Sequence, residues 1–260
     1  MSHPTKPTDV GMNRTGVAVS PIDSKEAIDG AIEGTERPDA SAAALEQVRL
    51  DYSREATPVG TMPPPASPKG AIKAVVTAVK GKHAMVFLDL IGERLAFERT
   101  GTRLYEAVLV KLAAGSPRDG GPDREDLERI RDDELRHFAL LQDALISLGA
   151  DPTAVTPSAD VTGVASMGLV QVVTDPRTTL TEALKTMLIA ELADNDGWLI
   201  LADMAERLEE TDLAASFREA LDEEEQHLAR LRTWVTADLD AQAGLEPRPV
   251  EPVEVPQPPG

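Results

Sequence analysis

The chain contains 260 residues, a length that allows one large domain or two small ones. Hydrophobic residues make up 42% of it, enough for a sizeable core, although only 3% are aromatic. The 26 Lys and Arg residues stand against 45 Asp and Glu residues, so the formal net charge is −19. This balance argues against a nucleic-acid binder, which needs a basic face to neutralise phosphates. Cysteine is absent, which excludes disulfides, Cys-ligated zinc, iron–sulfur clusters and thiol catalysis.

Apolar runs in this sequence are short. Residues 1–30 lack the long apolar run of a signal peptide, and no stretch of eighteen apolar residues could span a bilayer. We therefore expect a soluble, cytoplasmic protein that binds no membrane.

Proline divides the chain into three parts. Nine of the twenty prolines lie in residues 1–70 and six lie in residues 244–260. We expect residues 1–70 to be a mostly disordered extension, with helical turns near 24–32 and 41–50, because their composition cannot repay the entropy of ordering. Residues 71–243 form the expected folded domain, and 244–260 form a Pro-rich tail.

Between the prolines, Ala, Leu, Glu and Arg dominate, which favours helices and predicts an all-α class. The first helix can extend back to an amphipathic stretch near residue 71, and the third begins with Thr178 or Thr179 as its cap. Gly-Gly-Pro-Asp at 120–123 precedes the second helix. Long helices are expected at about 87–113, 124–148, 178–208 and 212–239, and a weaker short helix at 161–173.

Each expected long helix carries a glutamate at the centre of its apolar face, and two of them add a histidine three residues later. Such buried charges need compensation, and the apolar stripes contain no Lys or Arg. The order Glu, Glu-x-x-His, Glu, Glu-x-x-His is that of a di-iron or di-manganese site in a four-helix bundle, whereas a single Glu-x-x-His usually lies on a solvated helix face. The residues are Glu98, Glu134, His137, Glu191, Glu224 and His227.

The connection at about 149–177 is longer than two antiparallel neighbours need. It suits a crossover that runs the length of the bundle and leaves the second and third helices parallel. That topology, with one long crossover, is ferritin-like.

Over about 85–240 the chain resembles the ferritin-like superfamily of di-iron carboxylate proteins. Glu98 followed by Tyr105 resembles the first helix of bacterioferritins and rubrerythrins. The run Asp-Glu-Leu-Arg-His at 133–137 is similar to the Asp-Glu-x-Arg-His motif of bacterial di-iron oxygenases and acyl carrier protein desaturases. Glu191 with Asp194 resembles the Glu-x-x-Glu of rubrerythrin, and the run 223–227 supplies the second Glu-x-x-His.

The resemblance implies two iron ions, or manganese, held by the six residues above, with Glu134 and Glu224 bridging and no haem. Metal-bound histidines usually donate to a carboxylate, so we expect Asp133 to accept from His227 and Glu223 to accept from His137. Solvent exposure of both acids is the alternative. Asp194 is expected beside the ligands.

Three further residues are ambiguous from the sequence. Tyr105 can pack in the core or donate to a ligand carboxylate, and with Glu134 and Glu224 it forms the expected catalytic set. Trp198 fits the core better than an electron-transfer route. Gly101 can leave room for dioxygen or substrate, or can allow close helix packing.

Three functions stay open. The first is oxidation of Fe(II) with dioxygen or peroxide, of the ferroxidase or peroxide-detoxifying type, and it is the one we expect. The second is oxygenation or desaturation of an organic substrate, and the third is a non-enzymatic partner-binding or cargo module. The expected partners are metal ions and dioxygen or peroxide; a homodimer and a protein partner for the tails stay open.

Overall fold

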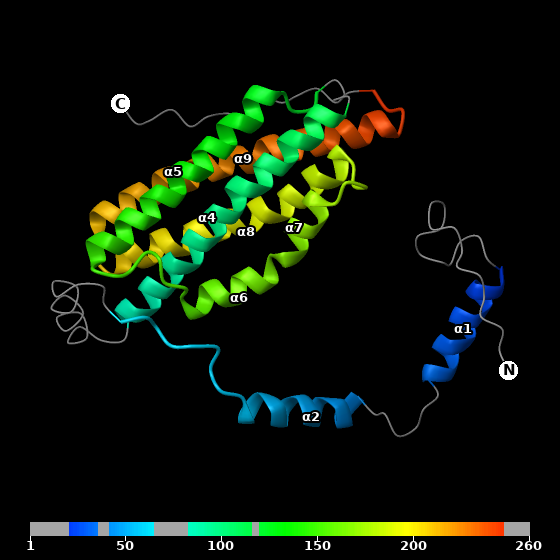
Figure 1. Ribbon diagram of the computed structural model, residues 1–260, viewed down its shortest axis with the longest axis horizontal. Helices are drawn as coiled ribbons and strands as arrows, with labels where there is room; N and C mark the ends of the chain where they lie inside the picture. Colours follow the sequence, from blue (N-terminus) through cyan, green and yellow to red (C-terminus); the bar gives the residue numbers. More distant parts are fainter. Residues whose placement is uncertain (1–20, 36–41, 65–82, 116–119, 247–260) are drawn as a thin grey trace. The chain divides into compact units, whose positions relative to one another are not determined.

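The computed structural model describes residues 21–35, 42–64, 83–115 and 120–246 (Figure 1). These residues form α-helices and no strand, which confirms the all-α prediction. The chain divides into two compact units, Met1–Pro58 and Val59–Gly260. The expected start of the first long helix near residue 71 and most of the expected Pro-rich tail, from 247 on, lie outside the described residues.

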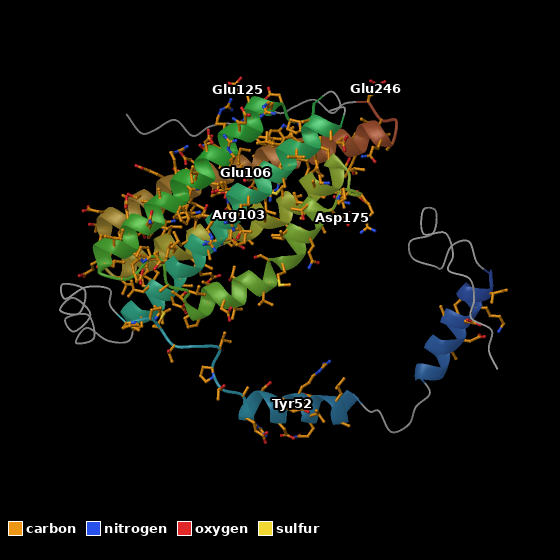
Figure 2. All side chains as sticks on the ribbon, in the orientation of Figure 1. Tyr52, Arg103, Glu106, Glu125, Asp175 and Glu246 are labelled. Atoms are coloured by element: carbon orange, nitrogen blue, oxygen red, sulfur yellow. The ribbon has the colours of Figure 1, made fainter. Side chains whose placement is uncertain are left out.

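The first unit contains helices α1 (Pro21–Thr35) and α2 (Ala42–Glu55). Both are longer than the helical turns expected near 24–32 and 41–50. The side chains described on α2 are exposed to solvent, as Tyr52 illustrates (Figure 2). Neither helix therefore buries an apolar stripe within the described residues.

The second unit is built on four long helices: α4 (His83–Ala114), α5 (Arg124–Leu148), α8 (Leu180–Arg207) and α9 (Thr211–Gln242). They lie side by side like a helical bundle, with α4 against α5 and α8 against α9 as antiparallel pairs (Figure 1). The two pairs meet where α4 contacts α8 and α5 contacts α9. The observed bounds agree with the predicted helices to within a few residues.

The connection between α5 and α8 holds two short helices, α6 (Pro157–Ala165) and α7 (Met167–Thr174), where the sequence predicts one. Both pack along α4, and α7 also contacts α8 (Figure 1). Asp89 of α4 fixes the start of α6, because its carboxylate accepts the Ser158 N–H at 2.9 Å and the Ser158 hydroxyl at 2.7 Å.

Local signals in the sequence define the helix ends. Asp123 caps α5 by accepting the N–H of Asp126 at 2.7 Å, and Gly149 ends the same helix in the left-handed region, at φ 81°. Thr179 and Glu182 form a capping box at the start of α8, in which the Glu182 carboxylate accepts the Thr179 N–H at 2.8 Å. These caps fix where α5 and α8 begin, and thus the height at which their buried acids lie.

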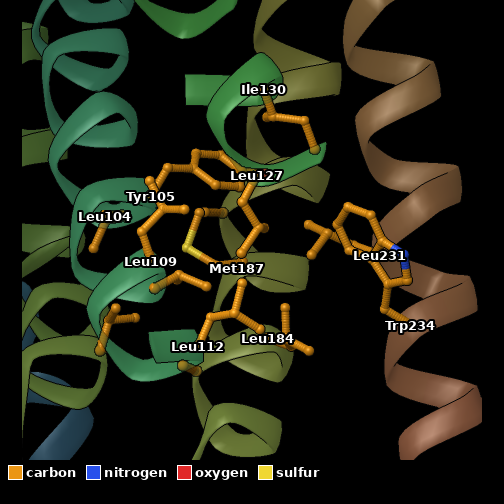
Figure 3. Close-up of a cluster of buried hydrophobic side chains, with 14 of the residues drawn as sticks. Leu104, Tyr105, Leu109, Leu112, Leu127, Ile130, Leu184, Met187, Leu231 and Trp234 are labelled. Atoms are coloured by element: carbon orange, nitrogen blue, oxygen red, sulfur yellow. The ribbon is translucent and has the colours of Figure 1, made fainter. Parts of the chain in front are cut away.

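Two clusters of buried apolar side chains fill the second unit. One includes Leu104, Met187 and Leu231 (Figure 3), and the other includes Phe87 and Phe217. Both draw on all four long helices. Between them along those helices lies a layer of buried acidic and imidazole side chains.

Loss of the capping box should destabilise the second unit. We expect Thr179→Ala to lower the free energy of unfolding by about 1 kcal/mol, because the N–H of Glu182 loses its acceptor. Urea unfolding followed by circular dichroism measures this. Thr211→Ala, at the exposed first residue of α9, is the control and should change the value by less than about 0.5 kcal/mol. Equal effects of the two substitutions would contradict the role of the cap.

Candidate metal centre

The predicted ligands converge in the polar layer of the second unit. Each of the six is at least 97% buried, and Asp194 is buried with them. They come from all four long helices, as the periodicity of the sequence predicts. None of the six points to solvent.

Their ligand atoms form three overlapping groups in which all atoms lie within 4.8 Å of one another. Glu224 belongs to all three groups, and Glu98 and Glu134 belong to two each. The groups are Glu134–Glu191–Glu224–His227, Glu98–His137–Glu224 and Glu98–Glu134–Asp194–Glu224.

The two histidines lie on either side of Glu224. His137 Nδ1 is 2.7 Å from Glu224 Oε1, and His227 Nδ1 is 3.2 Å from Glu224 Oε2. One nitrogen of each ring therefore faces the cluster, which leaves the other nitrogen for a partner outside it.

The expected partners of those outer nitrogens are present. His227 Nε2 lies 3.1 Å from Asp133 Oδ2, and His137 Nε2 lies 2.8 Å from Glu223 Oε2. Each acid thus contacts the histidine of the opposite helix. Such a contact fixes the ring orientation and the position of its proton.

Arg136 joins these two acids, a role that was not predicted from the sequence. Its guanidinium donates to the Asp133 carboxylate and, at 3.0 Å, to Glu223 Oε1. The contact with Asp133 could have been predicted from spacing, because residue 136 is one turn after residue 133 on the same face of α5. The two acids and Arg136 therefore tie α5 to α9 beside the cluster.

Most buried polar atoms without a hydrogen-bond partner belong to this layer. Among the described residues six buried side-chain atoms lack a partner, and five of them come from predicted ligands. Buried polar groups are normally paired, so such a concentration needs an explanation. The five atoms are Glu98 Oε2, Glu134 Oε2, His137 Nδ1, Glu191 Oε2 and Glu224 Oε1. Two of them, His137 Nδ1 and Glu224 Oε1, lie 2.7 Å apart but do not form a hydrogen bond.

Burial and mutual repulsion change the pKa values of the acids in the cluster. Burial, followed by the nearby carboxylates, raises the pKa values of Glu98 and Glu134 well above their usual range. The same causes raise the pKa of Glu191. Burial acts against the ionised form of Glu224 too, but contacts with the two imidazoles lower its pKa.

The prediction that the buried faces contain no basic residue is wrong. The sequence predicts no Lys or Arg on the buried faces, but Arg94 is 95% buried and its Nη1 lies 2.5 Å from Asp194 Oδ1. The missed signal was spacing, since residue 94 lies four positions before Glu98 on the same face of α4. Gly197 makes room for it, because a Cβ there would lie 2.2 Å from Arg94 Nη1.

Two aromatic residues donate to ligand carboxylates. The Tyr105 hydroxyl donates to Glu191 Oε1 while its ring packs in an apolar cluster, so both roles that the sequence left open for it are present. The Trp198 indole N–H donates to Glu98 Oε1 at 2.8 Å while its ring packs in the apolar cluster. The expected core position of Trp198 is confirmed, and this hydrogen bond was not foreseen.

Gly101 makes room for an acid. A Cβ at this position would lie 2.0 Å from Glu134 Oε2 and 2.8 Å from Glu134 Cδ. The glycine therefore allows the Glu134 carboxylate to approach the backbone of α4.

No family model, curated protein or solved structure matches this chain. Among the described residues, no helix has the length and apolar content needed to cross a membrane.

A methyl group at Gly101 should disturb the cluster. We expect Gly101→Ala to lower the free energy of unfolding by about 1–3 kcal/mol, because the buried Glu134 carboxylate must move into space that other acids fill. Gly163→Ala is the matched control on α6, where a Cβ would meet no atom within 4 Å. It should stabilise the protein by about 0.5–1 kcal/mol through helix propensity. A stabilised Gly101→Ala protein would contradict the close approach of Glu134.

The stability of the metal-free protein should fall as pH rises. Burial raises the pKa of Asp194 from 3.8 to about 6 despite the nearby Arg94 guanidinium. The contacts with Asp133 and Glu224 outweigh burial and raise the pKa of His227 from 6.5 to about 10. Between the ordinary and the raised values the folded state binds more protons than the unfolded chain. Stability is therefore lost between about pH 4 and 6 and again between about pH 6.5 and 10.

Urea midpoints measured in chelator at pH 5, 7 and 9 test this trend, and a midpoint that rises across the series would contradict it. With saturating Mn(II) the decline should be smaller, because bound cations then take the place of the protons.

Proposed function

We propose that the polar layer holds two metal ions, iron or manganese, in a ferritin-like di-metal bundle. The observation that carries the proposal is a set of buried carboxylate oxygens on predicted ligands that have no hydrogen-bond partner: Glu98 Oε2, Glu134 Oε2 and Glu191 Oε2. A protein seldom buries several carboxylates with unused lone pairs unless a cation completes them. Oxygen and imidazole donors suit iron and manganese.

The grouping of the ligand atoms supports a pair of adjacent ions. Glu224 lies between the two histidines and belongs to every group, which suits a bridging carboxylate. We assign Glu98 and His137 to one ion, Glu191 and His227 to the other, and Glu134 and Glu224 to both.

The path of the chain also supports a ferritin-like bundle. α6 and α7 lie along α4 in the connection between α5 and α8 (Figure 1). A connection of this kind lets α5 and α8 run in the same direction, as in bundles with one long crossover.

We propose oxidation of Fe(II) by dioxygen or peroxide as the activity. Two Fe(II) ions give up one electron each, and these electrons with two protons convert dioxygen to hydrogen peroxide, or hydrogen peroxide to two molecules of water. The acidic surface, with a net charge of −19, favours the approach of cations. Tyr105 and Trp198 hold Glu191 and Glu98 in place, and Asp133 and Glu223 fix the two imidazoles.

A pocket of about 460 Å³ favours a second candidate, the oxidation of an apolar organic substrate. It is lined by α4, α5, the loop before α6, α6 and the start of α7, and its lining includes Leu95, Phe97 and Phe138. Phe97 directly precedes the predicted ligand Glu98 in the sequence, and Phe138 directly follows the predicted ligand His137.

Adjacent glutamates on α9 offer a matched test. Glu224→Gln should reduce tightly bound metal from two ions per chain to one or none and slow Fe(II) oxidation at least tenfold, because the shared anion is lost. Glu225→Gln changes an exposed neighbour and should leave both values unchanged. Metal content is measured by elemental analysis after iron loading, and oxidation by the absorbance of Fe(III).

Wild-type protein that retains no metal would contradict the proposal. Rapid Fe(II) oxidation without an organic compound would favour the first activity. Oxygen consumption that requires an apolar substrate would favour the second.

A further inference from the structure

One cationic side chain, Arg94, is buried in the centre, and it is not a ligand of the proposed metal ions. Its guanidinium lies 2.5 Å from Asp194 Oδ1 and 3.1 Å from the Asp194 carbonyl oxygen. Its Cζ lies 4.3 Å from the centroid of the Phe97 ring. These contacts hold the guanidinium in one position among buried groups.

Arg94 forms its ion pair with Asp194. Asp194 belongs to the third ligand group, with Glu98, Glu134 and Glu224, although it is not among the six proposed ligands. Two atoms of that group, Glu98 Oε2 and Glu134 Oε2, have no hydrogen-bond partner. The guanidinium therefore holds one oxygen of an acid that could otherwise complete a further cation site.

The charges of the fully buried groups of the centre balance only when Arg94 is counted. Glu98, Glu134, Glu191, Asp194 and Glu224 contribute five negative charges when ionised, and Arg94 contributes one positive charge. Imidazoles that bind a metal ion are neutral and add none, so four negative charges remain. Two divalent ions neutralise these four charges, whereas without Arg94 one negative charge would remain in a buried layer, where uncompensated charge is costly.

We propose that Arg94 sets the metal capacity of the centre: by pairing with Asp194 it limits the site to two divalent ions and keeps a third from binding. This inference rests on the proposed metal centre and adds to it a positioning residue that determines stoichiometry. The ion pair also depends on Gly197, because only a residue without a side chain leaves space for the Arg94 guanidinium.

Mn(II) titration of the metal-free full-length chain tests the inference, with free Mn(II) counted by electron paramagnetic resonance. Wild-type protein should bind two ions per chain. Arg94→Met should bind a third ion, because Asp194 becomes available as a ligand and two divalent ions would leave one negative charge in the layer. Arg94→Lys keeps the positive charge and should bind two.

Substitution of Asp194 should change the number of bound metal ions in the opposite direction to substitution of Arg94 by Met. Asp194→Asn leaves the guanidinium without its counter-charge and should weaken binding of the second ion at least tenfold. The double variant Arg94→Met, Asp194→Asn should return to two ions. A general loss of structure would instead lower binding in both single variants, so the opposite signs separate a charge-setting role from a structural one.

Arg94→Gln retains donors for the nearby carbonyl groups and serves if Arg94→Met does not fold; it too should bind three ions. Two ions or fewer in a folded Arg94→Met or Arg94→Gln protein would overturn the inference. Wild-type protein that binds two Mn(II) ions but does not oxidise Fe(II) would refute the proposed activity and leave the role of Arg94 intact. Wild-type protein that binds no Mn(II) would refute both.

Discussion

The burial of five carboxylates in one layer of a helical bundle is the constraint on which the rest of this structure depends. Such groups repel one another and lose hydration, and each costs several kcal/mol unless another group compensates it. In the metal-free chain the compensation comes from two imidazoles, one guanidinium and raised carboxyl pKa values. Divalent cations would compensate the same charges more completely, which is the physical basis of the proposed metal centre.

The surroundings of the layer keep these groups in place. Apolar clusters on both sides exclude water and fix the spacing of the four long helices. Asp133 and Glu223 orient the imidazoles from the opposite helix, and Arg136 joins the two acids. Ligands that are oriented before a cation arrives lose little conformational entropy when it binds.

Two glycines provide the space that charged side chains fill in this layer. Gly101 admits the Glu134 carboxylate and Gly197 admits the Arg94 guanidinium, each at a distance that a Cβ would prevent. Both lie inside long helices, where glycine costs about 1 kcal/mol relative to alanine. The close approach of charged groups is the reason that this cost is tolerated. The arrangement of the charged groups in this layer thus depends on the absence of side chains at positions 101 and 197.

The sequence by itself determined the helices, the buried position of the six predicted ligands and the contacts of Asp133 and Glu223. Helical periodicity places a residue on a face, and Glu-x-x-His spacing brings two side chains to the same face. Periodicity does not say which residue of another helix lies opposite. The pairing of Arg94 with Asp194, the hydrogen bond from Trp198 to Glu98 and the space at Gly101 and Gly197 were therefore decided only by tertiary packing. Each joins residues of different helices, many positions apart in the chain, and depends on distances that only the packed bundle defines.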